Sequence, residues 1–167
     1  MGPVVGEPAP GFALHGIDGS TGADIHVGLA DLIGQTVVLA FYPADGSPVC
    51  TAQLRSYTEG IGALTDLDAA ILAISPQGPD AHRRFADDSG GFAFPLLSDD
   101  DKSVGRKYGV VGLLGLYRRS IFLVDAEGNL ASASRAIGPG LSFAPMSQLA
   151  RLVRQSKSAA MDDFEPE

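Results

Sequence analysis

The clearest pattern of hydrophobic and polar positions lies in the first half of the chain. Residues 36–42 form a run dominated by β-branched, aliphatic and aromatic side chains that ends at Pro43, which predicts a buried strand. Turn residues occupy positions 45–48, and over residues 49–64 the apolar side chains recur at helical spacing. This stretch therefore predicts a strand, a tight loop and a helix, with Cys50 where the loop meets the helix.

The remaining elements follow from the same two kinds of pattern. Before the central stretch we expect a hairpin with strands near residues 12–14 and 25–27 and a helical turn near 29–33. After it we expect a strand over 69–75, a polar helix over 80–88, a segment over 92–98 and a short helix from 99 to 108 that ends at Gly109. The chain then continues with a hairpin of 119–125 and 130–136, closed by 138–140, and a terminal helix over 145–157. Strands that alternate with helices imply parallel pairing through crossover connections. The elements predict one α/β domain over residues 1–157, followed by a short, frayed acidic tail over 158–167.

One apolar segment, residues 110–116, fits neither a helix nor a strand. It contains Gly112 and Gly115, which weaken both structures, so we expect a loop. An apolar loop either packs over the core or lies exposed as a contact surface, and the sequence leaves both possibilities open.

The composition is that of one globular domain, because 167 residues with 45% hydrophobic content can form a sizeable core. The net charge of −8 argues against nucleic acid or an anionic membrane surface as the main partner, since both select for basic patches. No apolar run is long enough to cross a membrane, and residues 1–3 lack the pattern of a signal peptide. We therefore expect a cytoplasmic protein.

Neither the acidic residues nor the histidines indicate a metal site. The acids at 99–101 would point in different directions from successive helical positions, and no second group of ligands accompanies them. His15, His26 and His82 lie on different predicted elements, with no spacing for zinc or for a catalytic pair with Cys50. The chain also lacks a phosphate-binding loop, so we expect no cofactor.

Cys50 is the only cysteine in the chain, which excludes an internal disulfide and fits a reducing compartment. At a helix N-terminus the free N–H groups and the helix dipole favour a thiolate, the nucleophilic form of cysteine. An alternative remains open. Cys50, Leu54 and Tyr57 fall on one helical face, as expected for a buried structural thiol.

Residues 41–51, Phe-Tyr-Pro-Ala-Asp-Gly-Ser-Pro-Val-Cys-Thr, resemble the active-site motif of peroxiredoxins. Pro43, Ser47 and Cys50 match its proline, its hydroxyl residue and its peroxidatic cysteine. The resemblance covers nearly the whole chain and includes residues 74–75, 94–99, 107–110 and 119–125. It is greatest to the bacterioferritin comigratory protein group of thioredoxin-dependent thiol peroxidases. It implies a thioredoxin-like fold, with a central mixed β-sheet flanked by helices and an N-terminal β-hairpin.

By this resemblance, Cys50 attacks a hydroperoxide and becomes a sulfenic acid, the first and reversible step of thiol oxidation. The departing oxygen gathers negative charge, which helix N-terminal N–H groups, the Ser47 hydroxyl and the Arg119 guanidinium would stabilise. The family places such an arginine at the start of a strand that ends in aspartate. Because neighbouring side chains of a strand point to opposite faces, only one of Arg118 and Arg119 can address Cys50.

The same resemblance implies that Pro43 shields the thiolate from water and that Tyr42 and Val49 line the substrate pocket. Two positions depart from the family pattern. Many members of the group carry a resolving cysteine five residues after the first, where this chain has Arg55, for which we expect a surface position. Ser47 stands where threonine is usual and keeps the hydroxyl group.

Without a second thiol, the sulfenic acid would need an external reductant: thioredoxin, glutaredoxin with a low-molecular-weight thiol, or Cys50 of a second subunit. The resemblance implies a monomer or a homodimer. We expect a single-cysteine peroxidase that reduces hydrogen peroxide and small organic hydroperoxides. Two alternatives stay open. A thioredoxin-type oxidoreductase is disfavoured by the missing Cys-x-x-Cys motif, and a non-enzymatic, redox-responsive protein would bind a partner through residues 110–116.

Overall fold

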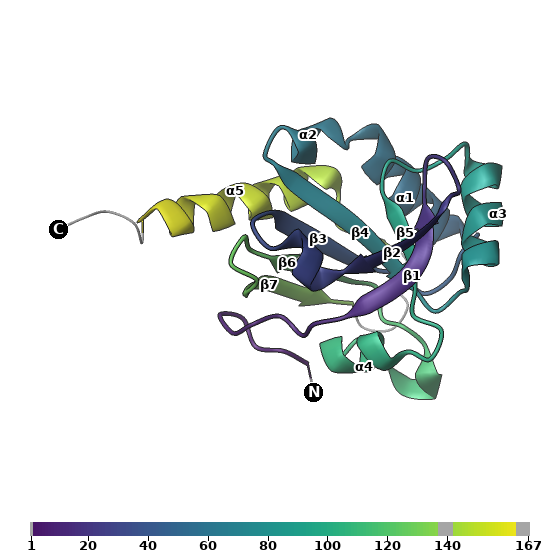
Figure 1. Cartoon of the computed structure of the whole chain (residues 1–167), viewed down its shortest axis with the longest axis horizontal. Helices are drawn as coiled ribbons and strands as arrows, with labels where there is room; N and C mark the ends of the chain where they lie inside the picture. The colour runs from purple at the N-terminus through teal and green to yellow at the C-terminus, as the bar shows by residue number, and fades with distance from the viewer. Residues whose placement is uncertain (1, 137–141, 163–167) are drawn as a thin grey trace.

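The structure, a computed structural model, describes residues 2–136 and 142–162 of the chain. Its centre is a seven-stranded mixed sheet with the strand order β2-β1-β5-β4-β3-β6-β7 (Figure 1). The strands are β1 (Ala13–Asp18), β2 (Asp24–Gly28), β3 (Thr36–Phe41), β4 (Ala69–Ser75), β5 (Pro95–Ser98), β6 (Ser120–Val124) and β7 (Leu130–Arg135). This sheet, with the N-terminal β1–β2 hairpin, confirms the predicted α/β architecture.

β3 and β4 lie at the centre of the sheet because their sequences are apolar on both faces, as buried parallel strands require. β3, β4 and β5 are parallel to one another, whereas β6 runs antiparallel to β3. In this register Phe41 of β3 lies opposite Ser120 of β6, and Ser75 of β4 lies opposite Ser98 of β5. The end of β3, which leads towards Cys50, therefore adjoins the start of β6, which follows Arg119.

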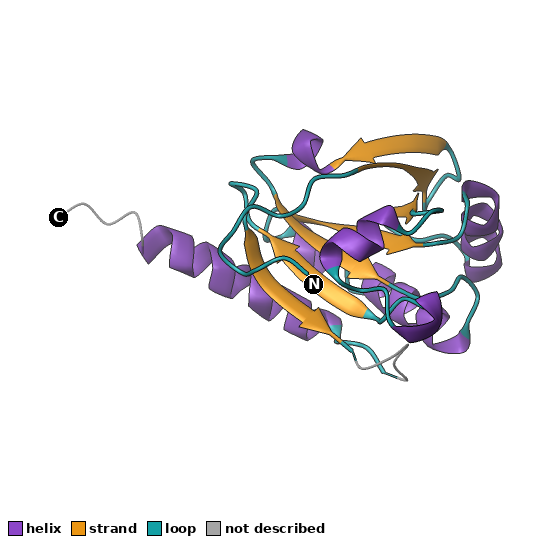
Figure 2. Ribbon diagram, turned by 90° about the horizontal axis from the view of Figure 1, so that it is seen from below, coloured by secondary structure: helices purple, strands orange, loops and turns teal. Residues whose placement is uncertain are grey.

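Helices cover both faces of the sheet (Figure 2). The helical elements are η1 (Leu29–Leu32), α1 (Pro48–Glu59), α2 (Gly62–Thr65), α3 (Pro79–Ser89), α4 (Ser103–Tyr108), η2 (Leu113–Gly115) and α5 (Met146–Asp162). On one face, side chains of α1, α3 and α5 form a core with Val38 and Ala40 of β3. On the other face, α4 and η1 form a second core with Leu39 and Phe41. Cys50 belongs to the first core.

The sequence predicts one helix over residues 49–64, but the structure divides it into α1 and α2. α1 ends at Glu59, and the N–H of Gly60 closes its last turn on the Ser56 carbonyl at 3.1 Å. A Cβ atom at Gly60 would lie 2.9 Å from the Met146 side chain, so the glycine admits the start of α5. Because apolar residues keep their helical spacing on both sides of Gly60, the sequence pattern did not predict the break between α1 and α2.

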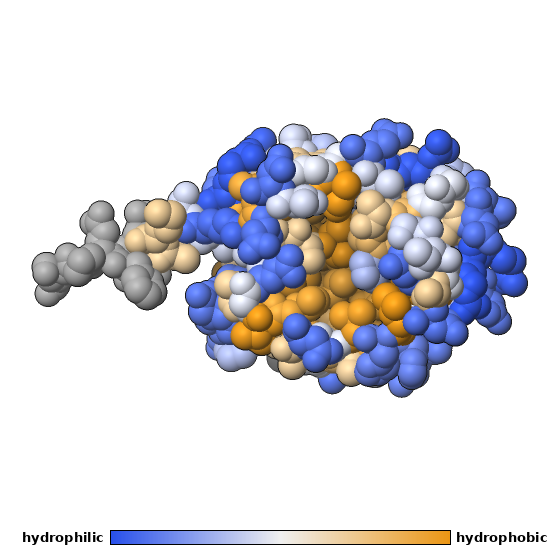
Figure 3. All heavy atoms as spheres, turned by 45° about the horizontal axis from the view of Figure 1, so that its top comes forward, coloured by the Kyte–Doolittle hydropathy of each residue, from blue (hydrophilic) through white to orange (hydrophobic). Residues whose placement is uncertain are grey.

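The polar character of α3 and the left-handed end of α4 agree with the sequence. α3 buries Phe85 and Ala86, and Figure 3 shows hydrophilic side chains over the end of the molecule where α3 lies. α4 ends at Gly109, whose φ of +72° is in the left-handed region that favours glycine at a helix C-terminus. His82 of α3 is also fully buried, which the sequence analysis did not anticipate.

The C-terminal helix is longer than predicted. α5 extends to Asp162, so residues 158–162 of the predicted tail are helical. Residues 163–167 and the predicted hairpin closure at 138–140 lie outside the described residues. No helix in the described part of the chain is long and apolar enough to cross a membrane.

The apolar segment 110–116 combines both arrangements that its sequence left open. Val110 is buried in the core beside α4, whereas Leu113 and Leu114 are 94% and 95% exposed. Leu114 has a φ of +66°, and the Lys102 ammonium group donates a hydrogen bond of 2.6 Å to the Gly115 carbonyl. Only the beginning of this segment packs inside, and its tip projects from the molecule.

Candidate active site

Cys50 lies in the first turn of α1, and Ser47 caps that helix. The Ser47 hydroxyl oxygen accepts a hydrogen bond from the Cys50 N–H at 3.3 Å, and Pro48 takes the first helical position, where a missing N–H costs nothing. The Thr51 N–H and hydroxyl donate to the Ser47 carbonyl at 2.9 and 2.8 Å. These contacts fix Cys50, whose side chain is 0% exposed, against the core.

Val49 supplies the one N–H group of this first turn that has no acceptor within the described residues. Pro48 has no N–H, and the N–H groups of Cys50 and Thr51 are both bound to Ser47. The Val49 N–H is therefore free to donate to an oxygen that approaches Cys50. Val49 was predicted from the family motif to line the substrate pocket, and it is half-buried beside the sulfur-bearing residue.

Arg119 points at Cys50 from the residue before β6. Its Nη2 donates to Cys50 Sγ at 3.3 Å, and its Nη1 donates to Gln53 Oε1. The arginine is 5% exposed, and within the described residues it has no carboxylate partner, while its Nε has no acceptor. The arginine therefore supplies a positive charge directly beside the sulfur.

Arg118 points away from Cys50, as strand alternation requires. Its Nη2 donates to the Gly109 carbonyl at 2.6 Å, on the α4 face of the sheet. Arg55, which stands at the position of the resolving cysteine, is exposed on α1. Of the three arginines that the sequence analysis considered, the structure therefore brings only Arg119 to the sulfur.

Gln53 is a site residue that the sequence analysis missed. Besides accepting from Arg119, it donates from Nε2 to the Tyr57 hydroxyl oxygen at 3.2 Å, and Tyr57 in turn donates to the Ala144 carbonyl at 2.7 Å. Burial raises the pKa of Tyr57 to about 12, so its hydroxyl stays a neutral donor. The sequence pattern could have indicated Gln53 as a site residue, because it is a polar residue on the same helical face as Cys50 and Tyr57.

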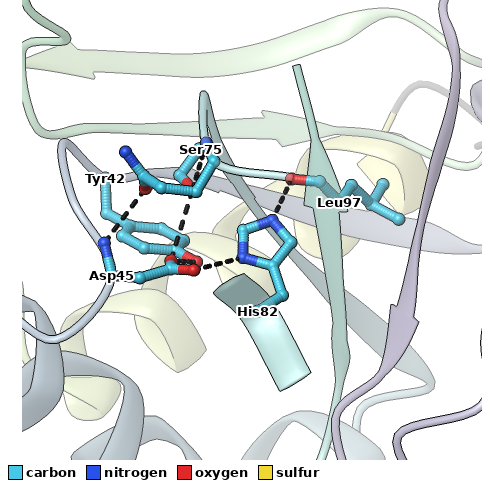
Figure 4. A network of polar contacts seen from close by, with 6 residues as sticks. Tyr42, Asp45, Ser75, His82 and Leu97 are labelled. Atoms are coloured by element: carbon cyan, nitrogen blue, oxygen red, sulfur yellow. Dashed lines mark hydrogen bonds and ion pairs between the residues drawn. The ribbon is translucent and has the colours of Figure 1, made fainter. Parts of the chain in front are cut away.

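A second set of polar residues anchors the loop before Cys50 (Figure 4). Asp45 accepts a hydrogen bond from the Tyr42 hydroxyl at 2.6 Å, and its other oxygen lies 2.6 Å from Nδ1 of His82. The backbone N–H of Asp45 donates to Gln77 Oε1 at 3.0 Å, and Gln77 accepts from Ser75 at 2.8 Å. The loop is thereby tied to β4 and α3.

Both ring nitrogens of His82 have hydrogen-bond partners. Nε2 lies 3.1 Å from the Leu97 carbonyl oxygen, and Nδ1 lies 2.6 Å from a carboxylate oxygen of Asp45. His82 therefore binds Asp45 and not Cys50, and the spacing of residues along the chain did not predict this contact.

Tyr42, predicted to line the substrate pocket, and Pro43, predicted to shield the thiolate, lie at the base of this loop. Tyr42 is fully buried, and burial together with the charge of Asp45 raises its pKa well above the ordinary value for tyrosine. Its hydroxyl is engaged by Asp45, so it supports the loop and is not free for a substrate. Pro43 is half-buried between Tyr42 and the turn.

A hollow of about 300 Å³ adjoins Gln53 and Arg119 and is bordered by residues of β6, β7 and the start of α5. Within the described residues, no three side chains among histidine, cysteine, aspartate and glutamate gather as a metal site. The groups that meet around the sulfur are the thiol itself, the Arg119 guanidinium, the Ser47 hydroxyl and the Val49 N–H.

Comparisons with known proteins agree with this geometry. The model of the AhpC/TSA family matches residues 5–133. Peroxiredoxin Bcp of Bacillus subtilis is 32% identical over 141 residues, which cover 80% of this chain and 85% of that protein. A thiol peroxidase of Mycobacterium bovis is 34% identical over 134 residues, covering 77% of this chain and 76% of that protein.

The solved structure of a reduced 2-Cys peroxiredoxin from Plasmodium vivax superposes with a TM-score of 0.87 and 23% identity, covering 95% of this chain and 85% of that one. At that identity the likeness concerns the fold alone, and it supports the thioredoxin-like architecture. The family match and the relatives above 30% identity concern the sequence itself. The chain therefore belongs to the AhpC/TSA family and is a peroxiredoxin.

Proposed function

We propose that this peroxiredoxin is a single-cysteine thiol peroxidase in which Cys50 is the nucleophile and Arg119 its electrostatic partner. The observation that supports the proposal is the 3.3 Å contact between the Arg119 guanidinium and Cys50 Sγ, at a buried helix N-terminus. The substrates are hydrogen peroxide and small organic hydroperoxides. Larger substrates are disfavoured because the sulfur itself has no exposed surface.

The peroxide step requires a thiolate and a stabilised leaving oxygen. The Cys50 sulfur attacks one peroxide oxygen, and the S–O bond forms as the O–O bond breaks. The sulfur is oxidised by two electrons to a sulfenic acid, while the other oxygen takes up a proton and leaves as water or an alcohol. Donors fixed before the reaction lower its barrier because they face the oxygen on which charge develops.

We assign this role to three groups. Arg119 has an Nε with no acceptor, the Val49 N–H is free, and the Ser47 hydroxyl keeps its own proton while its oxygen accepts from Cys50. Pro43 is half-buried and Tyr42 is fully buried. Their proposed role is to exclude water and hold the loop rather than to bind the oxygen.

The sulfenic acid is reduced by a thiol from another molecule, because the chain has one cysteine. That thiol attacks the sulfenic sulfur and releases water, and a second thiol then cleaves the mixed disulfide and regenerates Cys50. Thioredoxin, glutaredoxin or a low-molecular-weight thiol fits this role. The protein acts as a monomer or a homodimer, and in a dimer two Cys50 residues could supply the intermediate disulfide.

The test is stopped-flow reaction of the reduced protein with hydrogen peroxide, followed by mass spectrometry of Cys50. We expect a fast second-order reaction that leaves a sulfenic acid, and Cys50→Ser should abolish it while leaving the circular dichroism spectrum unchanged. A reaction no faster than that of free cysteine contradicts the proposal. Oxidation without turnover in the presence of thiols would favour the non-enzymatic, partner-binding alternative.

A further inference from the structure

Three arginines from separate parts of the chain surround a pocket on the sheet face opposite Cys50. Arg106 comes from α4, Arg118 from the segment before β6, and Arg135 from the end of β7. Together with Gly2, Gly109 and Val111 they line a hollow of about 470 Å³. The chain has only 12 lysine and arginine residues against 20 acidic ones, so three arginines among the residues that line one pocket are a marked local excess of positive charge.

No carboxylate neutralises these guanidinium groups within 4.0 Å in the described part of the chain. Arg118 donates to the Gly109 carbonyl at 2.6 Å, and Arg135 donates to the Tyr108 carbonyl at 3.1 and 2.7 Å. Arg106 donates to the Asp101 carbonyl at 2.8 Å. All the acceptors are backbone carbonyls, and those of Tyr108 and Gly109 at the C-terminus of α4 carry only a partial negative charge, which is less than the charge of the two guanidinium groups bound there.

Within the part of the chain that the structure describes, Arg118 keeps an unsatisfied donor, whereas the Arg135 guanidinium also lies over the Phe122 ring, 4.9 Å from its centroid. The Nε of Arg118 is buried and has no acceptor among the described residues, which is costly for a charged group. Burial, and then the charge of Arg118, lowers the pKa of Arg135. Capping of the α4 carbonyls accounts for one hydrogen bond of Arg118 and for those of Arg135, but it does not explain the orphaned Nε of Arg118.

We propose that this pocket binds the phosphate group of a small phosphorylated molecule. Guanidinium groups bind phosphate oxygens through paired N–H donors, and a dianionic phosphate would relieve the repulsion within the cluster. The volume exceeds what a bare halide needs and lies in the range of small-molecule sites. The N-terminal segment forms a close-fitting wall, because a Cβ atom at Gly2 would overlap the Arg135 guanidinium.

The proposed site is independent of the thiol chemistry. Arg118 and Arg119 are adjacent in sequence but lie on opposite faces of the sheet, so phosphate binding requires neither Cys50 nor peroxide. The experiment therefore uses the reduced protein without any oxidant. Its outcome leaves the peroxidase proposal untouched, and failure of the peroxidase proposal would leave this one standing.

The first measurement is a two-dimensional NMR titration of the wild-type protein with inorganic pyrophosphate, at constant ionic strength maintained with chloride. We expect saturable shifts of the backbone amides of Gly109 and Val111 and of the Arg118 side-chain Nε–H. Shifts confined to other regions, or a linear response that chloride reproduces, would overturn the proposal.

The second measurement compares thermal unfolding of Arg118→Gln and Arg135→Gln with that of the control Arg84→Gln, an exposed arginine on α3. Pyrophosphate at about ten times its Kd should raise the Tm of the wild type and of the control by about 3–5 °C. The two pocket variants should lose this shift. An equal shift in all four proteins would show non-specific charge screening. If a pocket variant fails to fold, the wild-type titration decides the question alone.

Discussion

Replacing Arg119 with glutamine is expected to slow the reaction of Cys50 with hydrogen peroxide by about 100- to 1,000-fold. The guanidinium is buried and donates to the sulfur at 3.3 Å, and its Nε has no acceptor among the described residues. Removing one such preorganised donor from a site without bulk water typically raises the barrier by about 3–4 kcal/mol, which corresponds to that loss of rate. Glutamine keeps a polar side chain next to Gln53, so the cavity left behind is small.

The assay is stopped-flow mixing with excess peroxide, where the slope of rate against peroxide concentration gives the second-order constant. Arg55→Gln, at an exposed position of the same helix as Cys50, should leave that constant unchanged. Arg118→Gln should lower it far less than Arg119→Gln, because Arg118 lies on the opposite face of the sheet. Equal losses in the Arg118 and Arg119 variants would refute the assignment, as would a fast reaction in Arg119→Gln.

Three further outcomes follow from the contacts around the site. Gln53→Leu removes the acceptor that orients Arg119, and we expect the peroxide reaction to slow by about 10- to 100-fold in the same assay. His82→Leu leaves Asp45 without its buried partner and should lower the free energy of unfolding by about 3–5 kcal/mol in urea titrations; an unchanged midpoint would contradict this. The folded-state pKa of Tyr57, about 12, exceeds the ordinary value of about 10, so its contribution to stability is intact below pH 10 and is lost as the pH rises towards 12. That loss is on the order of 2–3 kcal/mol, and Tyr57→Phe should show a correspondingly shallower decline in alkaline urea titrations.

The sequence was sufficient for the elements whose pattern and turn residues agree. The unbroken apolar runs of β3 and β4 predicted these two strands. Turn residues predicted the β1–β2 and β6–β7 hairpins, and Gly109 predicted the end of α4. Strand alternation predicts that only one of Arg118 and Arg119 faces the thiol, but the choice of Arg119 came from the family resemblance and not from the residue pattern. The break at Gly60 was missed because it depends on the approach of Met146, a contact that is distant in sequence.

The same limitation applies to the polar contacts of the site. Asp45 and His82 are 37 residues apart, and neither has a local pattern that marks it as a partner of the other. Gln53 and Arg119 are 66 residues apart, although the burial of Gln53 could have been inferred from its helical face. Residue periodicity predicts which face is buried, but not which polar groups meet there.

The sequence separation of the groups around Cys50 has a consequence for newly made protein. Arg119, the cation that faces the sulfur, is added 69 residues after Cys50, and at typical rates of synthesis this takes roughly 3–14 s. Ala144, which accepts the hydrogen bond of Tyr57, follows later still. Until then Cys50 is an ordinary thiol on an unfinished chain, without the charge that its chemistry requires. Ribosome-bound chains that end before Arg119 should therefore react with peroxide no faster than free cysteine.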